Sequence, residues 1–468
     1  MALSRRDLLI RSGAVGAGIG LTGSVGALFG TKAAYATPSG EAYGYGPLVP
    51  DPARVLDLPE GFSYRTFSKY RTPATGGLVP TRHDGMATFP GADASRVRLV
   101  RNHECHIDSV RVPAAPEFTF DRAAGAKGQL VPGGTMTVEL DDDLDVLSEY
   151  GSLGGTVRNC AGGRTPWGTW LSCEETEVRA GMRIHDGVFQ HDHGWVFEVD
   201  PANPSNNVDP MPLTGMGRYA HEAVAVDPAT SVAYLTEDAG APYGLLYRFT
   251  PADAGGGYGS YRAGGLLEAM RLPDVRDLSE VRDVNTRFND VDWVPVPDPL
   301  AVTVPTRMQL VDEEVTRAEK LEGAWYGDGH VFIVSSFASN DRAEGHPHDG
   351  QVWRYDPKAN ALTLELIFNG GSCTRFGRPD NITVSPFGGG VILAEDGLGD
   401  QYLVGVAQNG LPFPIARNAL NTAELAGVTF SPDNRTLFGN IFGGTGGGLS
   451  FAIRGPWAAV SPANPRSA

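Results

Sequence analysis

Two degenerate strand patterns recur along the chain and constrain its fold more than any other feature. The first runs strand, turn, strand, and its copies occupy residues 223–238, 381–396 and 426–440. Each copy carries alternating β-branched or aromatic residues on both sides of a turn rich in Pro, Asp, Asn and Gly, which predicts an antiparallel hairpin. The second pattern is an aromatic strand that ends in a turn, and it occupies residues 194–201, 245–251 and 351–357.

Repeated hairpins without intervening helices favour a β-propeller, a fold that adds core by adding blades. We therefore expect an all-β chain folded as a β-propeller, with a plain β-sandwich as the alternative. The copies are irregularly spaced, so inserted loops must separate the blades. Only residues 315–320 could form a short helix. No internal linker is rich enough in turn residues to split the chain, so residues 37–468 are predicted to form a single domain.

The N-terminus resembles a twin-arginine export signal. Arg5 and Arg6 precede a long apolar segment rich in Gly and Ala, and residues 34–36 offer a small-x-small cleavage site. We predict that residues 1–36 engage the twin-arginine export machinery and are removed, leaving a protein that is secreted or retained in the cell envelope. A membrane anchor is the alternative, but no later apolar run has the length to span a bilayer, so no stable span is expected after cleavage.

The formal net charge of −17 narrows the range of partners. The signal carries four basic residues and one acidic residue, so its removal makes the protein still more acidic. This charge argues against nucleic acid and anionic membranes as partners and fits the binding of cations. No self-complementary patch is legible, and we expect a monomer.

Acidic residues recur at the ends of the predicted strands. Two hairpins end in a Glu-Asp pair, and radially arranged blades bring equivalent strand ends toward a common channel mouth. Other carboxylates lie beside apolar strands or tight turns, and a cysteine stands in the acidic stretch LSCEETE. The candidate channel lining is Glu104, Cys173, Glu174, Glu222, Glu237, Asp238, Glu322, Glu395 and Asp396.

Such a set would repel itself unless it were protonated or bound cations. Two like charges about 4 Å apart cost about 4 kcal/mol at an effective dielectric constant near 20. Nearby carboxylates also make a thiolate rarer, so Cys173 is a poor nucleophile unless a cation lies beside it. Oxygen ligands suit calcium and a thiolate suits a transition metal, so we expect iron or zinc beside calcium. His103 and His221 could be ligands or could hydrogen-bond a carboxylate.

The remaining cysteines and one histidine pair stay outside the predicted site. Cys105, Cys160 and Cys373 are expected to be buried small residues, with a disulfide between two of them as the alternative. His191 and His193 would share one side of an extended segment, but a lone HxH is weak evidence for a metal site.

Several motifs resemble the PhoX-type alkaline phosphatase family. They are HDGMATF (83–89), VRNHE (100–104), NCAGGRTPWGTWLSCEET (159–176), GRYAHEA (217–223), LEGAWY (321–326) and RPDNI (378–382). The resemblance implies a six-bladed propeller that hydrolyses phosphate monoesters through a metal-activated oxygen. It also implies a central pair of ferric ions, joined by an oxo bridge and a cysteine thiolate, together with calcium ions.

The resemblance also assigns roles to individual residues. Cys173 would be an iron ligand and Glu174 a neighbouring metal ligand, while Asn102 would face the substrate. The remaining metal ligands implied are Glu104, Glu222, Glu322 and one or more of Asp380, Glu395 and Asp396.

One position departs from the family pattern. The phosphatases place an arginine two residues before the glutamate equivalent to Glu322, whereas this chain has Lys320, which lacks the bidentate guanidinium fork. Lys320, Arg378 and Arg218 are candidates to hold a small phosphoester substrate. Two rival functions stay open. One is a calcium-dependent propeller lactonase, because such enzymes also use Glu, Asn and Asp at the channel mouth, and the other is a non-catalytic, metal-stabilised binding propeller, which the departure at Lys320 supports.

Overall fold

The computed structural model describes residues 44–107, 109–336, 348–368, 376–387, 390–407, 410–443 and 447–458. The predicted signal peptide, residues 1–36, and Cys373 lie outside these residues.

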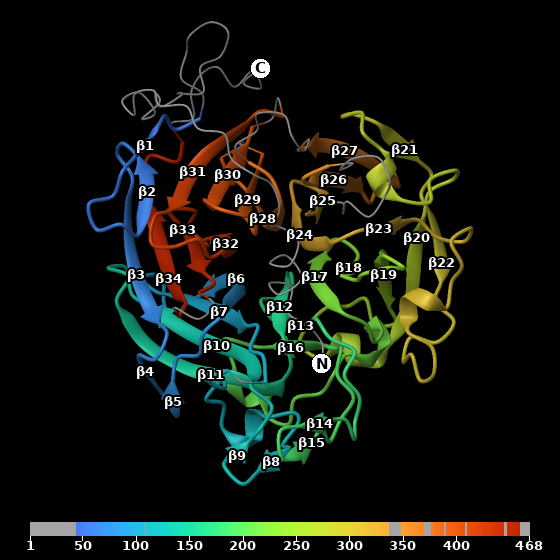
Figure 1. Cartoon of the computed structure of the whole chain (residues 1–468), viewed down its shortest axis with the longest axis horizontal. Coiled ribbons are helices and arrows are strands. Elements are labelled where there is room, and N and C mark those ends of the chain that lie inside the picture. Colours follow the sequence, from blue (N-terminus) through green and yellow to red (C-terminus); the bar gives the residue numbers. More distant parts are fainter. Residues whose placement is uncertain are drawn as a thin grey trace, which may run out of the picture.

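Six antiparallel sheets stand around a central axis, and the predicted six-bladed β-propeller is confirmed (Figure 1). Among the described residues the helices are all short 3-10 turns, namely η1 (Pro116–Phe118), η2 (Pro204–Asn207), η3 (Thr214–Met216), η4 (Ser260–Ala263), η5 (Leu278–Glu280) and η6 (Thr306–Met308). Residues 315–320 do not form the short helix that the sequence allowed. That segment contains strand β23 (Arg317–Ala318), which pairs with β19.

The blades are numbered here in chain order of their innermost strands. Blade 1 consists of β6 (His83–Pro90), β7 (Val97–His103), β10 (Gly133–Leu140) and β11 (Val146–Thr156). Blade 2 consists of β12 (Asn159–Arg164), β13 (Trp170–Glu174) and β16 (Val196–Val199). Blade 3 consists of β17 (His221–Val226), β18 (Ala233–Glu237), β19 (Gly244–Pro251), β20 (Gly265–Arg271) and β22 (Asp292–Pro295). Blade 4 consists of β24 (Leu321–Gly327), β25 (His330–Ser335), β26 (Gln351–Asp356), β27 (Ala361–Ile367) and β21 (Arg287–Asn289). Blade 5 consists of β28 (Pro379–Val384), β29 (Val391–Glu395), β30 (Tyr402–Val406), β31 (Pro412–Asn418), β2 (Leu56–Pro59) and β1 (Leu48–Val49). Blade 6 consists of β32 (Leu425–Phe430), β33 (Thr436–Ile441), β34 (Leu449–Arg454) and β3 (Ser63–Lys69). Small hairpins outside the blades are β4 (Pro73–Ala74) with β5 (Gly77–Leu78), β8 (Ala124–Gly125) with β9 (Gly128–Gln129), and β14 (Arg183–Ile184) with β15 (Gly187–Val188).

The innermost strands form a closed ring. They contact one another in the order β6, β12, β17, β24, β28, β32 and back to β6. Strand β3, from the N-terminal part of the chain, completes the last blade by pairing with β34, with Ser63 opposite Arg454. The first and last parts of the propeller are thus joined by backbone hydrogen bonds.

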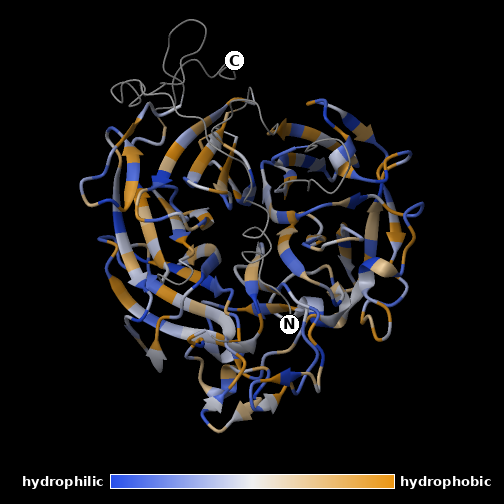
Figure 2. Cartoon of the chain, viewed as in Figure 1, coloured by the Kyte–Doolittle hydropathy of each residue, from blue (hydrophilic) through white to orange (hydrophobic). Residues whose placement is uncertain are grey.

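Local sequence explains the hairpins. In the predicted hairpin at residues 223–238, β17 and β18 present alternating apolar residues, and the Asp227 carboxylate accepts hydrogen bonds from the Ala229 amide and the Thr230 hydroxyl to form the turn. Apolar side chains of neighbouring blades then pack against one another. Hydrophobic residues, coloured orange, alternate with hydrophilic ones along many of the strands (Figure 2). No helix in the described part of the chain is long and apolar enough to cross a membrane.

Candidate metal centre

The same irregularity begins the innermost strand of every blade. The register with the second strand shifts directly after the first one or two residues, which is the signature of a β-bulge. The second residue of each innermost strand therefore occupies an equivalent position in all six blades. These residues are Asp84, Cys160, Glu222, Glu322, Asp380 and Ala426.

Small residues beside the bulges let the strands approach the axis closely. A Cβ atom on Gly85 would lie 2.5 Å from the Ala161 Cα, and one on Gly427 would lie 2.5 Å from the Asp84 carbonyl oxygen. The bulges thus crowd acidic side chains from different blades together.

Among the residues that the structure describes, three overlapping groups of side chains could hold metal ions. Within each group, the candidate ligand atoms lie within 4.8 Å of one another. The groups are Cys160, Glu175 and Glu222; Glu222, Glu322 and Asp380; and Asp380, Asp396 and Glu424. Glu222 and Asp380 each belong to two groups, so the three candidate sites form a continuous row across the channel mouth.

The electrostatics of this row fit bound cations. Burial raises the pKa of Glu222 and of Asp84 well above the ordinary range, and the charges of neighbouring carboxylates raise both further. Burial and then the charge of Asp396 raise the pKa of Asp380 to about 7. Burial, followed by the charges of Glu222 and Glu175, also raises the pKa of the Cys160 thiol. A cation would reverse each of these shifts.

Four basic residues surround the row and are called here the basic collar. Arg82, Arg158, Lys320 and Arg378 each precede the first residue of an innermost strand, and each has a left-handed backbone with φ between 52° and 56°. Lys320 Nζ lies 2.8 Å from Asp238 and 2.5 Å from Glu322. Arg158 lies 3.2 Å from both Glu104 and Glu175. The predicted clamp residues Lys320 and Arg378 therefore belong to one repeated structural position.

Glu104 pairs with Arg82 and Arg158 of the basic collar and belongs to none of the three groups. Burial alone would raise its pKa, but hydrogen bonding to His106 and the charges of Arg158 and Arg82 outweigh burial and lower it to about 2. The other predicted clamp residue, Arg218, is buried, and its Nη1 donates to the His193 carbonyl oxygen at 3.3 Å.

Three predicted ligands have structural partners instead of facing the three groups. Glu174 accepts hydrogen bonds from the amides of Val157 and Gly194, and Glu395 accepts them from those of Gly377 and Tyr402. Glu237 accepts the Tyr247 hydroxyl at 2.7 Å.

Each of these residues ends a second strand, and side chains alternate between the two faces of an extended chain. The following residue therefore faces the site. Those residues are Glu175, Asp238 and Asp396.

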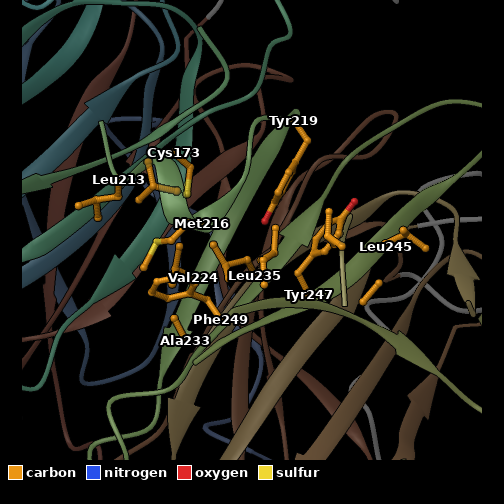
Figure 3. Packing of buried hydrophobic residues seen from close by; sticks show 14 of the residues in the cluster. Cys173, Leu213, Met216, Tyr219, Val224, Ala233, Leu235, Leu245, Tyr247 and Phe249 are labelled. Carbon is orange, nitrogen blue, oxygen red and sulfur yellow. The ribbon is translucent and has the colours of Figure 1, made fainter. Parts of the chain in front are cut away.

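Cys173, the predicted iron ligand, belongs to none of the three groups. Its side chain is fully buried in an apolar cluster with Leu213, Met216 and Tyr219 (Figure 3). Cys160 is buried, as predicted, and its sulfur also lies close to carboxylate oxygens of Glu175 and Glu222. Cys105, Cys160 and Cys173 are all free thiols.

Asn102 is fully buried and does not face the three groups. Its amide donates to the carbonyl oxygens of Cys160 and Ala161, at 3.1 and 2.6 Å, and its oxygen accepts from Trp170 and Ser172 at 2.9 Å. These bonds satisfy the whole side chain. Asn102 thus holds the bulge that presents Cys160.

His103 and His221, predicted either to bind a metal or to hydrogen-bond a carboxylate, belong to none of the three groups. His103 and His221 are fully buried, and their ring nitrogens donate hydrogen bonds to the carbonyl oxygens of Thr81 and Gly217. They support the loops that enter the innermost strands.

His193 joins two buried carboxylates and gives the fold a pH dependence. Its Nδ1 lies 2.6 Å from Glu174 and its Nε2 3.2 Å from Asp121. Burial alone would lower its pKa, but the Glu174 charge and hydrogen bonds to Asp121 and Glu174 raise the pKa to about 9. The charged histidine therefore stabilises the fold fully below about pH 6.5, and this contribution is lost as the pH rises through 9.

We expect the free energy of unfolding to fall by up to about 3 kcal/mol between pH 6.5 and 10 through this group. The substitution His193→Gln should remove that part of the slope. Denaturant titrations of both proteins across this pH range measure the two slopes. Equal slopes would show that His193 does not carry a stabilising charge between Glu174 and Asp121.

Three members of the groups were not predicted from the motifs, namely Cys160, Glu175 and Glu424, and neither was Asp84, whose pKa is raised by burial and by the charges of Asp380 and Glu175. Asp84 and Cys160 share a signal that the sequence does contain. In HDG, NCA, HEA and LEG, a polar residue precedes Gly or Ala at the start of an innermost strand. Glu424 has no such motif, because Ala426 occupies the bulge of blade 6.

A six-bladed propeller with a row of closely spaced carboxylates and a thiol at its channel mouth defines a class of propellers that could hold metal ions. The family model of alkaline phosphatase PhoX matches residues 43–145 and 132–444. The chain belongs to the alkaline phosphatase PhoX family.

Comparison with solved structures supports the fold. Pseudomonas fluorescens PhoX in complex with vanadate, a transition state analogue, superposes with a TM-score of 0.66 at 16% identity, covering 90% of this chain and 99% of that one. A gluconolactonase of Xanthomonas campestris gives a TM-score of 0.35 at 13% identity, covering 82% of this chain and 99% of that one. No curated protein sequence matches the chain.

Proposed function

We propose that the protein is a metal-dependent hydrolase of phosphate monoesters, with iron at the thiol end of its site and calcium at the oxygen-only end. The observation that carries the proposal is the row of three overlapping ligand groups in a member of the alkaline phosphatase PhoX family. Bound cations supply charge neutralisation for the phosphate oxygens and a strong oxygen nucleophile.

The donor chemistry supports this assignment of metals. The group of Cys160, Glu175 and Glu222 combines a soft thiolate with carboxylates, which suits iron. The groups of Glu222, Glu322 and Asp380 and of Asp380, Asp396 and Glu424 offer only oxygen atoms, which suit calcium. In this proposal Cys160 is the iron ligand and Glu175 the neighbouring metal ligand, the two roles that the family resemblance assigned to Cys173 and Glu174.

The basic collar would bind the substrate. Lys320 and Arg158 now pair with the carboxylates that would hold the metals, and both side chains are partly exposed at the channel mouth. Once those carboxylates bind cations, the collar can donate hydrogen bonds to phosphate oxygens. Lys320 provides a point charge at the position where the phosphatases have an arginine, so we propose that Arg158 and Arg378 supply the planar donors.

We further propose that the protein is exported as a monomer by the twin-arginine route and acts outside the cytoplasm or in the cell envelope. The two arginines and cleavage site at the N-terminus support this proposal.

The test is metal analysis and hydrolysis by protein purified after export. We expect iron and calcium together with turnover of p-nitrophenyl phosphate, which a calcium chelator abolishes and added calcium restores. Bis-p-nitrophenyl phosphate and a simple lactone serve as comparison substrates. A full metal content without phosphate release would contradict the proposal, as would turnover of the lactone alone.

A further inference from the structure

The channel closes in its middle and opens again at the end away from the carboxylates. Small residues of the innermost strands and the indoles of Trp170 and Trp325 leave a space of only about 20 Å³ there. Beyond it lies a cavity of about 690 Å³, within the size range of small-molecule sites. The C-terminal ends of four innermost strands line this far cavity, through Arg164, Gly327, Val384 and Phe430. The candidate metal ligands lie at the opposite ends of the same strands.

Arg164 is the unusual residue of this far cavity. It ends β12, and no other described residue forms a hydrogen bond or ion pair with its guanidinium. Its side chain is exposed to the solvent in the cavity, and desolvation by the surrounding protein lowers its pKa. By contrast, Arg354 on the same wall is paired with Glu365. An accessible guanidinium without a protein partner can donate charge-assisted hydrogen bonds to an anion.

The remaining lining mixes polar and apolar side chains. Apart from the paired Glu365, the acidic residue in the lining is Asp328, which is exposed in the β24–β25 turn. The apolar and aromatic part of the wall consists of Trp325, Phe332, Val352, Leu366, Val384, Val391, Val406 and Phe430. The far cavity therefore combines one available positive charge with apolar side chains that an organic body could contact.

We propose that the far cavity binds a small organic anion, with its charged group on Arg164 and an aromatic or aliphatic body against Trp325 and the neighbouring valines. This site is separate from the candidate metal centre, because the closed middle of the channel lies between them. The proposal does not depend on the hydrolase activity.

The test uses 1-anilinonaphthalene-8-sulfonate, a sulfonate with an aromatic body, as the probe. We expect one probe molecule to bind per folded chain and to quench Trp325 by energy transfer. Arg164→Ala should weaken binding by about tenfold or more, because a hydrogen-bonded charge pair is lost. Trp325→Phe should reduce the quenching while the probe still binds.

Arg271→Ala is the matched control, because Arg271 is also exposed at the end of a strand but lies outside the far cavity. It should leave probe affinity unchanged, and saturating inorganic phosphate should not displace the probe. Near-ultraviolet circular dichroism checks that each variant is folded. Equal affinity of wild type and Arg164→Ala, displacement by phosphate, or binding no tighter than millimolar would each overturn the proposal.

Discussion

Replacing Cys160 with alanine should remove iron from the protein and lower kcat/KM for p-nitrophenyl phosphate by at least about a hundredfold. Cys160 is the only thiol in the three candidate metal groups of the described residues. Loss of a direct ligand should cost more than the tenfold to hundredfold that loss of an outer-shell partner typically costs. Metal analysis and steady-state kinetics on the exported variant measure both effects.

Cys173→Ala is the matched control for this experiment. Cys173 packs in an apolar cluster with Leu213 and Met216, so its truncation should cost about 1 kcal/mol of stability while leaving iron content and activity near wild type. The opposite result, iron lost with Cys173 and retained without Cys160, would show that the thiolate ligand was assigned to the wrong cysteine.

Glu222→Gln should have the other large effect, because Glu222 belongs to two of the three groups. The variant should lose metal at both groups, and activity should fall at least about a hundredfold. Burial and neighbouring carboxylates raise the pKa of Glu222 above that of a free glutamate. In the metal-free fold its ionisation is therefore unfavourable, and the free energy of unfolding falls as the pH rises above the pKa of a free glutamate. In the presence of a chelator, Glu222→Gln should therefore raise Tm by several degrees at alkaline pH.

Glu237→Gln separates this effect from a general loss of a buried carboxylate. Glu237 accepts hydrogen bonds from the Leu245 amide and the Tyr247 hydroxyl and lies outside the three groups. Its substitution should leave metal content unchanged, and its effect on Tm should be the same with and without metals. Scanning calorimetry with and without chelator distinguishes the two variants, and a lower Tm for metal-free Glu222→Gln would argue against carboxylate repulsion at the site.

The fold could be predicted because its signals are local. Alternating apolar residues and turns such as the one that Asp227 forms specify hairpins, and their repetition without helices indicates blades. The two-residue strand β23 could not be predicted, because it forms only through pairing of Arg317 and Ala318 with a distant strand.

The site could be predicted only in part. Glu222, Glu322, Asp380 and Asp396 were proposed from motifs and strand ends, and the structure brings them together. In the Glu-Asp pairs, however, alternation along the strand turns Glu237 and Glu395 toward backbone amides and leaves the following aspartate facing the site.

The choice between Cys160 and Cys173 depends on a bulge held by Asn102. That bulge arises from contacts between blades 1 and 2. Glu424 enters the site only through the closure of the ring between blades 5 and 6. Neither relation is encoded within a single strand.

The central claim is that Cys160, Glu175 and Glu222 bind iron at the mouth of the propeller channel. The most direct measurement is anomalous scattering at the iron absorption edge from crystals of the exported protein. We predict an iron peak at bonding distance from the Cys160 sulfur and from the carboxylates of Glu175 and Glu222. A peak beside Cys173, or the absence of iron from crystals of a protein that hydrolyses phosphate esters, would contradict the claim.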